Sequence, residues 1–187
     1  MIVLPFFTIN CNFYYFYKAI PTNHMTEKEE LTATSRSLRG TVIDEWIYLE
    51  KAIERFIVNH LSSDKNKRYE IMGILTDRLS FESKRQAFKS ILDGDDDIES
   101  DHKKGKKRPH AELIEEIRKV NIDRNNFAHY YLDNSADAVM LFKQTGEVSF
   151  FEMRDKPIKK TYTKEKFLDL INRIQACTHA IVKTAVK

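Results

Sequence analysis

The chain of 187 residues contains only two cysteines and carries almost no net charge. Cys11 and Cys177 stand near opposite ends of the sequence and lack the close spacing of a metal-binding or redox pair. This usage indicates a reducing compartment, so we expect a cytoplasmic protein. The formal net charge of +3 gives no strong overall attraction to nucleic acids or membranes. Any polyanion must therefore be bound by a local group of residues.

The sequence also lacks the patterns of a metal site, of a phosphate-binding loop and of an internal repeat. His60 and His110 are isolated residues without ligand spacing, so we expect no metal site. The short stretch "TGE" at 145–147 lacks the other elements of a phosphate-binding loop and indicates a turn. The sequence has no internal repeat. We accordingly expect no cofactor.

What is present fits one globular domain. Apolar residues make up 42% of the chain and charged residues 32%, which argues against extensive disorder. We expect an all-α fold, a bundle of about five helices with a small β-hairpin inserted before the last helix. The domain is expected to span residues 25–187.

Residues 1–24 differ from the rest, because they are rich in aromatic side chains and contain Lys18 as their one charged residue. No basic residue precedes the apolar run and no cleavage site follows it, so we do not expect a signal peptide. Three interpretations stay open: an over-extended start, a packed extra segment, or a membrane anchor, for which Pro5, Asn10 and Asn12 are unfavourable. We expect no membrane partner. Thr26 and Glu29 have the spacing of a capping box.

Apolar periodicity predicts a long helix over 27–61, followed by shorter helices over 69–79 and 80–92, with Ser80 as an N-cap. A helix is predicted over 111–132, then a hairpin in which 138–144 pairs with 148–154 across the turn. A closing amphipathic helix follows Thr163. The apolar positions that define the long and closing helices are Leu38, Val42, Trp46, Leu49, Ile53 and Phe56 in the first, and Phe167, Leu170, Ile171, Ile174 and Ile181 in the last.

The segment 93–110 shows no apolar periodicity and is expected to be a mobile loop. Its first half is acidic and its second half is basic. The bases are candidates for contacts with RNA phosphates, although a solvated loop balanced by its own acids is the simpler interpretation. These candidates are Lys103, Lys104, Lys106, Lys107 and Arg108.

The stretch "NIDRNNFAHYYL" at 121–132 interrupts an apolar seam with polar residues. The seam positions, spaced four and three apart, are Leu113, Ile117, Val120, Arg124, Phe127 and Tyr131. A guanidinium at such a position is costly unless it is paired or opens onto a cleft. Each residue of a helix turns by about 100°, so His129 lies about 140° around from Arg124, whereas Asn125 shares a face with His129. Arg124 and His129 therefore converge more easily from two copies of the helix.

An arginine and a histidine without a carboxylate cluster fit RNA cleavage by the strand's own 2′-hydroxyl. Histidine can take or deliver the proton near neutral pH, and arginine can neutralise charge that grows on the phosphate. Asn125 can orient either the histidine or the phosphate. The simpler alternative is that Arg124 and His129 face water or pair with an acid such as Asp123.

"RNNFAH" resembles the Arg–polar–three residues–His signature of HEPN domains, and "LSFESKRQAFKSIL" and "RNNFAHYYLD" resemble phrases common in prokaryotic members. The resemblance covers about 30–187. It implies a homodimeric, metal-independent endoribonuclease of a toxin–antitoxin or antiviral defence system, with Arg124 and His129 catalytic and Asn125 supportive. Two alternatives stay open: a non-catalytic HEPN-like module that binds RNA or nucleotide, and a helical adaptor for another protein.

The spacing of His129 and Tyr131 also resembles HEPN toxins whose tyrosine is adenylylated by a nucleotidyltransferase-type antitoxin. This implies Tyr131 as a modification site and such an antitoxin as a partner. Two features depart from that pattern, the length of this chain and the expected hairpin after the motif. Since Tyr131 also falls in the apolar seam, ordinary packing is the competing expectation.

Overall fold

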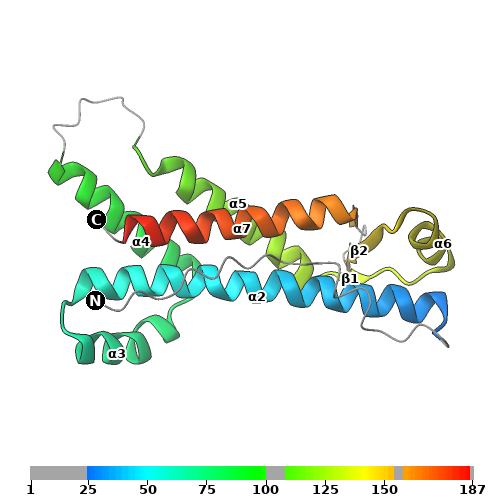
Figure 1. Cartoon of the computed structure of the whole chain (residues 1–187), viewed down its shortest axis with the longest axis horizontal. Coiled ribbons are helices and arrows are strands. Elements are labelled where there is room, and N and C mark those ends of the chain that lie inside the picture. Colours follow the sequence, from blue (N-terminus) through cyan, green and yellow to red (C-terminus); the bar gives the residue numbers. More distant parts are fainter. Residues whose placement is uncertain (1–24, 100–107, 154–157, 186–187) are drawn as a thin grey trace.

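The computed structural model describes residues 25–99, 108–153 and 158–185, and within them the fold is mostly helical, as predicted (Figure 1). The predicted N-terminal segment 1–24 lies outside the described residues. The described helices are α2 (Glu27–Leu61), α3 (Lys65–Ile74), the 3₁₀ turn η1 (Thr76–Arg78), α4 (Phe81–Glu99), α5 (Ala111–His129), α6 (Ala136–Thr145) and α7 (Lys164–Thr184), and the strands are β1 (Tyr131–Leu132), β2 (Val148–Glu152) and β3 (Ile158–Tyr162).

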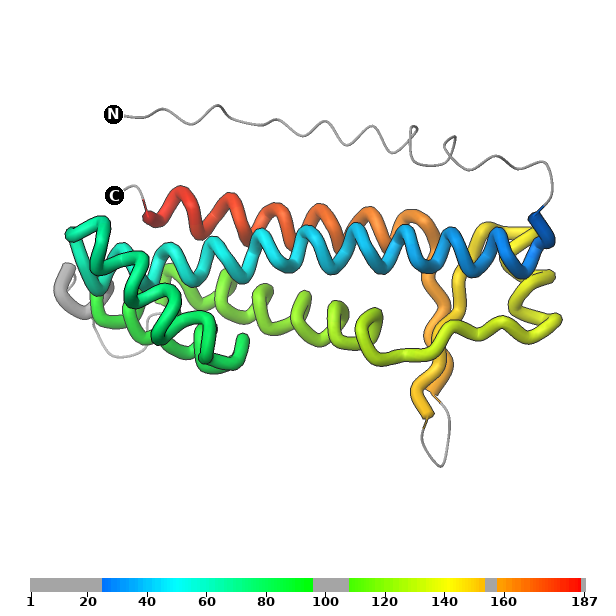
Figure 2. Tube along the Cα trace, turned by 90° about the horizontal axis from the view of Figure 1, so that it is seen from below, coloured from blue at the N-terminus to red at the C-terminus, as the bar shows by residue number. Residues whose placement is uncertain are grey.

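The long helix α2 begins and runs as its sequence predicts. The Thr26 hydroxyl accepts from the Glu29 amide, and the Glu29 carboxylate accepts from the Thr26 amide, which completes the capping box. All six predicted apolar positions of α2 are buried. The five predicted positions of α7, which begins after Thr163, are buried as well. Figures 1 and 2 show α2 and α7 side by side in the same direction, with α5 running the opposite way.

The remaining elements occupy the two ends of this three-helix frame. α3 and α4 lie at one end, and the sheet and α6 at the other (Figures 1 and 2). Aromatic contacts fasten α4 to α2, with ring centroids 4.3 Å apart for Trp46 and Phe81 and 4.8 Å for Phe56 and Phe88. The buried Trp46 is thus a core residue, as predicted.

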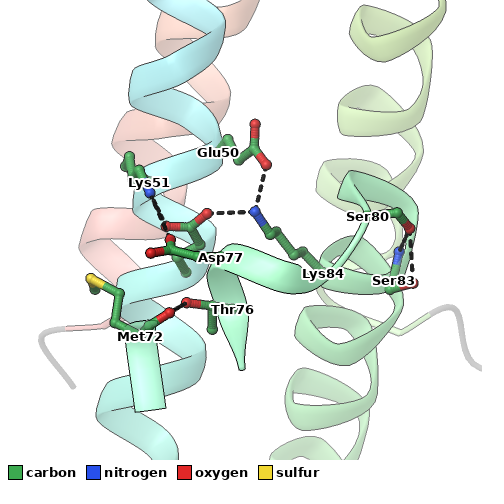
Figure 3. Close-up of polar contacts among 9 residues, drawn as sticks. Glu50, Lys51, Met72, Thr76, Asp77, Ser80, Ser83 and Lys84 are labelled. Carbon is green, nitrogen blue, oxygen red and sulfur yellow. Dashed lines mark hydrogen bonds and ion pairs between the residues drawn. The ribbon is translucent and has the colours of Figure 1, made fainter. Parts of the chain in front are cut away.

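An ionic network with a buried centre adds to the contact between α2 and α4 (Figure 3). The Lys84 ammonium of α4 lies 2.5 Å from a Glu54 oxygen and 2.6 Å from a Glu50 oxygen of α2. Lys51 pairs with the other Glu54 oxygen at 2.7 Å and with Asp77 of η1 at 3.2 Å. The network therefore joins α2, η1 and α4.

The predicted loop over 93–110 is wrong for its first part, because α4 continues to Glu99. Ser80 does cap this helix, since its hydroxyl accepts from the Ser83 amide. Lys89 and Asp93, one turn apart, form an ion pair of 2.6 Å that supports the helix after its apolar pattern ends. α3 also begins earlier than predicted, because Asp64 caps it by accepting from the amides of Asn66 and Lys67.

The predicted hairpin partner 138–144 is wrong, because these residues belong to α6. Ser135 caps the start of α6, and Gly146, with φ of 71°, ends it in the left-handed conformation that glycine tolerates. Ala138 and Phe142, four apart, are both buried. β2 instead pairs antiparallel with β1 on one side and β3 on the other.

The predicted end of the motif helix is also wrong, because α5 stops at His129 rather than at 132. Tyr130 is its C-cap, and Tyr131 and Leu132 pair with Phe151 and Phe150 of β2. Tyr131 therefore leaves the apolar seam: it is 60% exposed and stacks on Phe151, with ring centroids 5.9 Å apart. Strand pairing, which single-helix periodicity does not report, decides this boundary.

Phe127 joins the helical frame to the sheet. Its ring packs against Phe150 of β2, Tyr162 of β3 and Phe167 of α7, with centroid distances of 5.7, 4.6 and 4.9 Å. This aromatic cluster anchors the C-terminal half of α5, where the motif lies.

In the part of the chain that the structure describes, no helix is long and apolar enough to cross a membrane.

Candidate functional site

Arg124 lies on the side of α5 that faces α2. Its guanidinium carbon is 5.7 Å from the centre of the Trp46 ring, a cation–π contact. One terminal nitrogen donates to the Asn125 side-chain oxygen at 3.1 Å. The Arg124 Nε is buried and has no hydrogen-bond partner among the described residues. Arg124 thus lies in the predicted seam as a half-buried charged side chain.

The acid that could have neutralised Arg124 is held elsewhere. Asp123 pairs with Arg173 of α7 at 3.2 Å, and the same guanidinium lies 2.6 Å from Glu116. Within the described residues, no ion pair joins Arg124 to a carboxylate. Because an arginine is permanently charged, its charge in this place is open to an anionic ligand.

His129 is the last residue of α5 and is exposed. Asn125 lies one turn before it on the same face and is half-buried. The structure brings Arg124 and Asn125 together, as the hydrogen bond between them shows. No hydrogen bond joins His129 to either residue within the described part of the chain. One copy of α5 therefore directs Arg124 toward α2 and leaves His129 at the surface.

Tyr130, the residue after His129, is held by contacts with several elements. The sequence analysis did not predict these contacts. The Arg39 guanidinium of α2 donates to the Tyr130 carbonyl oxygen. The Tyr130 hydroxyl donates to Glu152 of β2 at 2.9 Å, and the Lys160 ammonium of β3 lies 5.5 Å from the centre of the Tyr130 ring. A signal for Arg39 exists in the sequence, since it precedes Trp46 by two helical turns and so shares its face.

The two other groups of candidate residues are separate from this arrangement. Arg108, just before the start of α5 and far from His129 along it, lies 3.1 Å from Asp93 of α4, so its charge is shared with an acid. Tyr131 is exposed on β1, two residues beyond His129. The candidate RNA-binding lysines lie outside the described residues: Lys103, Lys104, Lys106 and Lys107.

A polar region on the opposite side of α5 contains a tyrosine whose pKa is strongly raised. Burial, and then the negative charge of Asp123, raises the pKa of Tyr162 to about 12. Asn126, one residue before Phe127, is buried, and its side chain acts on the pKa of Tyr162 in the opposite, lowering direction. An open depression lined by Asp123, Tyr162 and Arg173 lies beside them, and its lining does not include Arg124 or His129.

Metal-binding clusters of three or more His, Cys, Asp or Glu side chains are absent from the residues that the structure describes. Cys177 is buried and unpaired, and burial raises the pKa of its thiol to about 11, so it is held as a neutral core side chain.

Comparisons with protein-family models, with curated proteins and with solved structures find no match for this chain.

Proposed function

We propose that this protein is a metal-independent endoribonuclease of HEPN type that works as a homodimer in the cytoplasm. The RNA 2′-hydroxyl attacks the neighbouring phosphorus, the bond to the 5′-oxygen of the next nucleotide breaks, and a 2′,3′-cyclic phosphate and a 5′-hydroxyl form. His129 exchanges the protons of this reaction and Arg124 neutralises the charge on the phosphate oxygens. Asn125 orients the Arg124 guanidinium.

The observation that carries the proposal is the half-buried Arg124 without a carboxylate partner among the described residues. A cation in an apolar seam costs free energy, and a phosphate would offset that cost. In ordinary packing Asp123 would supply the counterion, but Asp123 pairs with Arg173. The position of Arg124 therefore favours a ligand role over a structural one.

The exposure of His129 is the second support. A general acid or base must reach the substrate, and an exposed side chain at a helix end can do so. Because Arg124 and His129 lie about 140° apart around α5, a single phosphate is contacted more easily by residues from two chains. This geometry favours a site completed by a second copy.

The biological setting follows from the resemblance alone. HEPN ribonucleases of this kind act as toxins or in antiviral defence, and a nucleotidyltransferase-type antitoxin that modifies Tyr131 is the partner that the resemblance implies. The exposure of Tyr131 on β1 makes its hydroxyl accessible to such an enzyme.

The proposal is tested with purified protein, mixed RNA and an excess of chelator, with mapping of the product ends. We expect cleavage to persist and to leave 2′,3′-cyclic phosphates and 5′-hydroxyls. Complete dependence on added magnesium, or products that carry 5′-phosphates, would contradict the mechanism. RNA binding without cleavage would instead favour the non-catalytic module.

A further inference from the structure

We propose that Arg39 of α2 is a positioning residue for His129, acting through the Tyr130 carbonyl group. This inference rests on the proposed function, because it gives His129 its catalytic role. The contact itself joins residues 91 positions apart in the sequence, so it fixes the end of α5 against α2.

The chain on the far side of His129 is fastened to four elements. The Tyr130 amide donates to the Asn126 carbonyl at 2.9 Å within α5, and its carbonyl accepts from Arg39 of α2. Its side chain contacts Glu152 of β2 and Lys160 of β3. The next residues enter the sheet, where Tyr131 faces Phe151. Tyr130 is thus a fixed point, and His129 is attached directly to it.

The position of Arg39 costs free energy, which is unfavourable for a residue with a purely structural role. Its guanidinium lies 4.5 Å from the centre of the Phe150 ring, it is half-buried, and its Nε is buried with no partner in the described part of the chain. Burial also lowers the pKa of Arg39. No carboxylate pairs with Arg39 among the described residues. A charged side chain in such surroundings usually has a counterion, or is replaced by an uncharged residue, unless it serves a function.

The geometry favours positioning over direct contact with RNA. One terminal nitrogen of Arg39 donates to the Tyr130 carbonyl oxygen, and the guanidinium carbon lies 4.5 Å from the centre of the Phe150 ring, so the group is already engaged within the protein. Removing Arg39 would leave the α5–β1 junction tied to the sheet but not to α2. The orientation of His129 relative to α2, and hence to a phosphate held by Arg124 of the second copy, would then vary. A shift of about 1 Å in a catalytic group is enough to slow a reaction by roughly a hundredfold.

The test compares three full-length variants with the wild type. Arg39→Met keeps the length of the side chain but removes its donors and charge, and Arg39→Lys keeps the charge with a single donor group. Arg68→Met is the matched control, because it removes another half-buried guanidinium that donates to a backbone carbonyl, that of Ser62 at 2.7 Å, on α3 at the other end of the molecule. Thermal unfolding of each variant establishes that it is folded.

Two measurements are made on each folded variant. We expect Arg39→Met to lower the single-turnover cleavage rate at saturating RNA by about tenfold to a hundredfold, with the Kd for a non-cleavable 2′-deoxy-substituted RNA changed less than about twofold. Arg39→Lys should recover part of the rate. The NMR signals of the His129 imidazole should move or broaden in Arg39→Met and stay in place in Arg68→Met.

Each contrary result overturns the assignment. A weaker Kd with an unchanged rate would make Arg39 an RNA-contacting residue. Unchanged His129 signals in Arg39→Met, or equal changes in Arg68→Met, would reduce Arg39 to a general stabiliser of the fold. If the wild-type protein cleaves no RNA, the proposed function fails, whereas the NMR comparison still reports whether Arg39 orients His129.

Discussion

At the scale of single residues, Arg124 and His129 occupy opposite environments on one helix. Arg124 is half-buried beside Trp46 with an unpaired Nε, whereas His129 is exposed at the end of α5. Residues kept for stability usually have satisfied polar atoms or buried apolar surface. Neither description fits this pair, so substitution should separate activity from stability.

We expect His129→Ala to lower cleavage by at least about a hundredfold and to change the free energy of unfolding by less than about 0.5 kcal/mol, because the side chain is exposed. Arg124→Met should also lose cleavage, while its stability stays equal or rises slightly, because a charge leaves an apolar seam. Cleavage assays and urea unfolding measure the two properties.

The control on the same helix is Ile117→Ala, which empties a fully buried position and should cost about 2–5 kcal/mol. Unfolded or monomeric His129→Ala and Arg124→Met proteins would mean that these residues hold the fold. Retained cleavage in either variant would remove that residue from the mechanism.

At the scale of elements, the attachment of α4 to α2 depends on ions as well as on aromatic rings (Figure 3). The Lys84 side chain is 5% exposed and the Glu54 side chain 1% exposed. Burial opposes the charged form of Lys84, but its hydrogen bonds to Glu50 and Glu54 outweigh this and raise the pKa of Lys84. The ammonium therefore stays charged, and the network stays closed, throughout the neutral range.

We expect Lys84→Met to destabilise the protein by about 3–5 kcal/mol, because the buried Glu54 would lose its buried counterion, whereas the exposed Lys51 can be replaced by water. The matched control is Lys51→Met, which removes a partner of the same Glu54 from a side chain that is 45% exposed, and it should cost less than about 1 kcal/mol. Urea unfolding curves give both values.

The double variant Lys84→Met/Glu54→Met removes both buried charges and should recover most of the loss. No recovery would show that the loss in Lys84→Met comes from packing rather than from an unpaired carboxylate. Equal losses in Lys84→Met and Lys51→Met would show that burial does not separate the two pairs.

At the scale of the whole molecule, the frame of α2, α5 and α7 carries α3 and α4 at one end and the sheet at the other (Figure 2). The motif lies in the half of α5 that meets the sheet. The proposed active site needs Arg124 and His129 on one phosphate, and the angle of about 140° between them makes a second chain the simplest source of the missing residue.

Mixing Arg124→Ala protein with His129→Ala protein tests this composite site. After subunit exchange, one half of each heterodimer combines an intact Arg124 with an intact His129 from the other chain. Cleavage should return to at most about half of the wild-type level per heterodimer if the halves act independently. Exchange that is demonstrated by labelled subunits but restores no cleavage would reject the composite site.

Local pattern in the sequence determined the three frame helices. Three local features each involve only three to seven residues and can therefore form within a single helix. They are the capping box at Thr26, the apolar stripe around Trp46 and the cap at Thr163. The placement of Arg124 in a seam and of Asn125 beside His129 followed from the same periodicity. The catalytic use of these residues stays a prediction.

Only the tertiary structure decided the end of α5, the strand pairing and the contact of Arg39 with Tyr130. A short apolar run such as 138–144 fits a strand or a helix, and the cap at Ser135, the turn at Gly146 and burial against neighbouring elements select the helix. Tyr131 leaves the helix because β2 offers backbone partners that lie about 20 residues away in sequence. The Arg39–Tyr130 hydrogen bond spans 91 residues, and no local pattern specifies a contact whose two partners are brought together by the packing of α2 against α5.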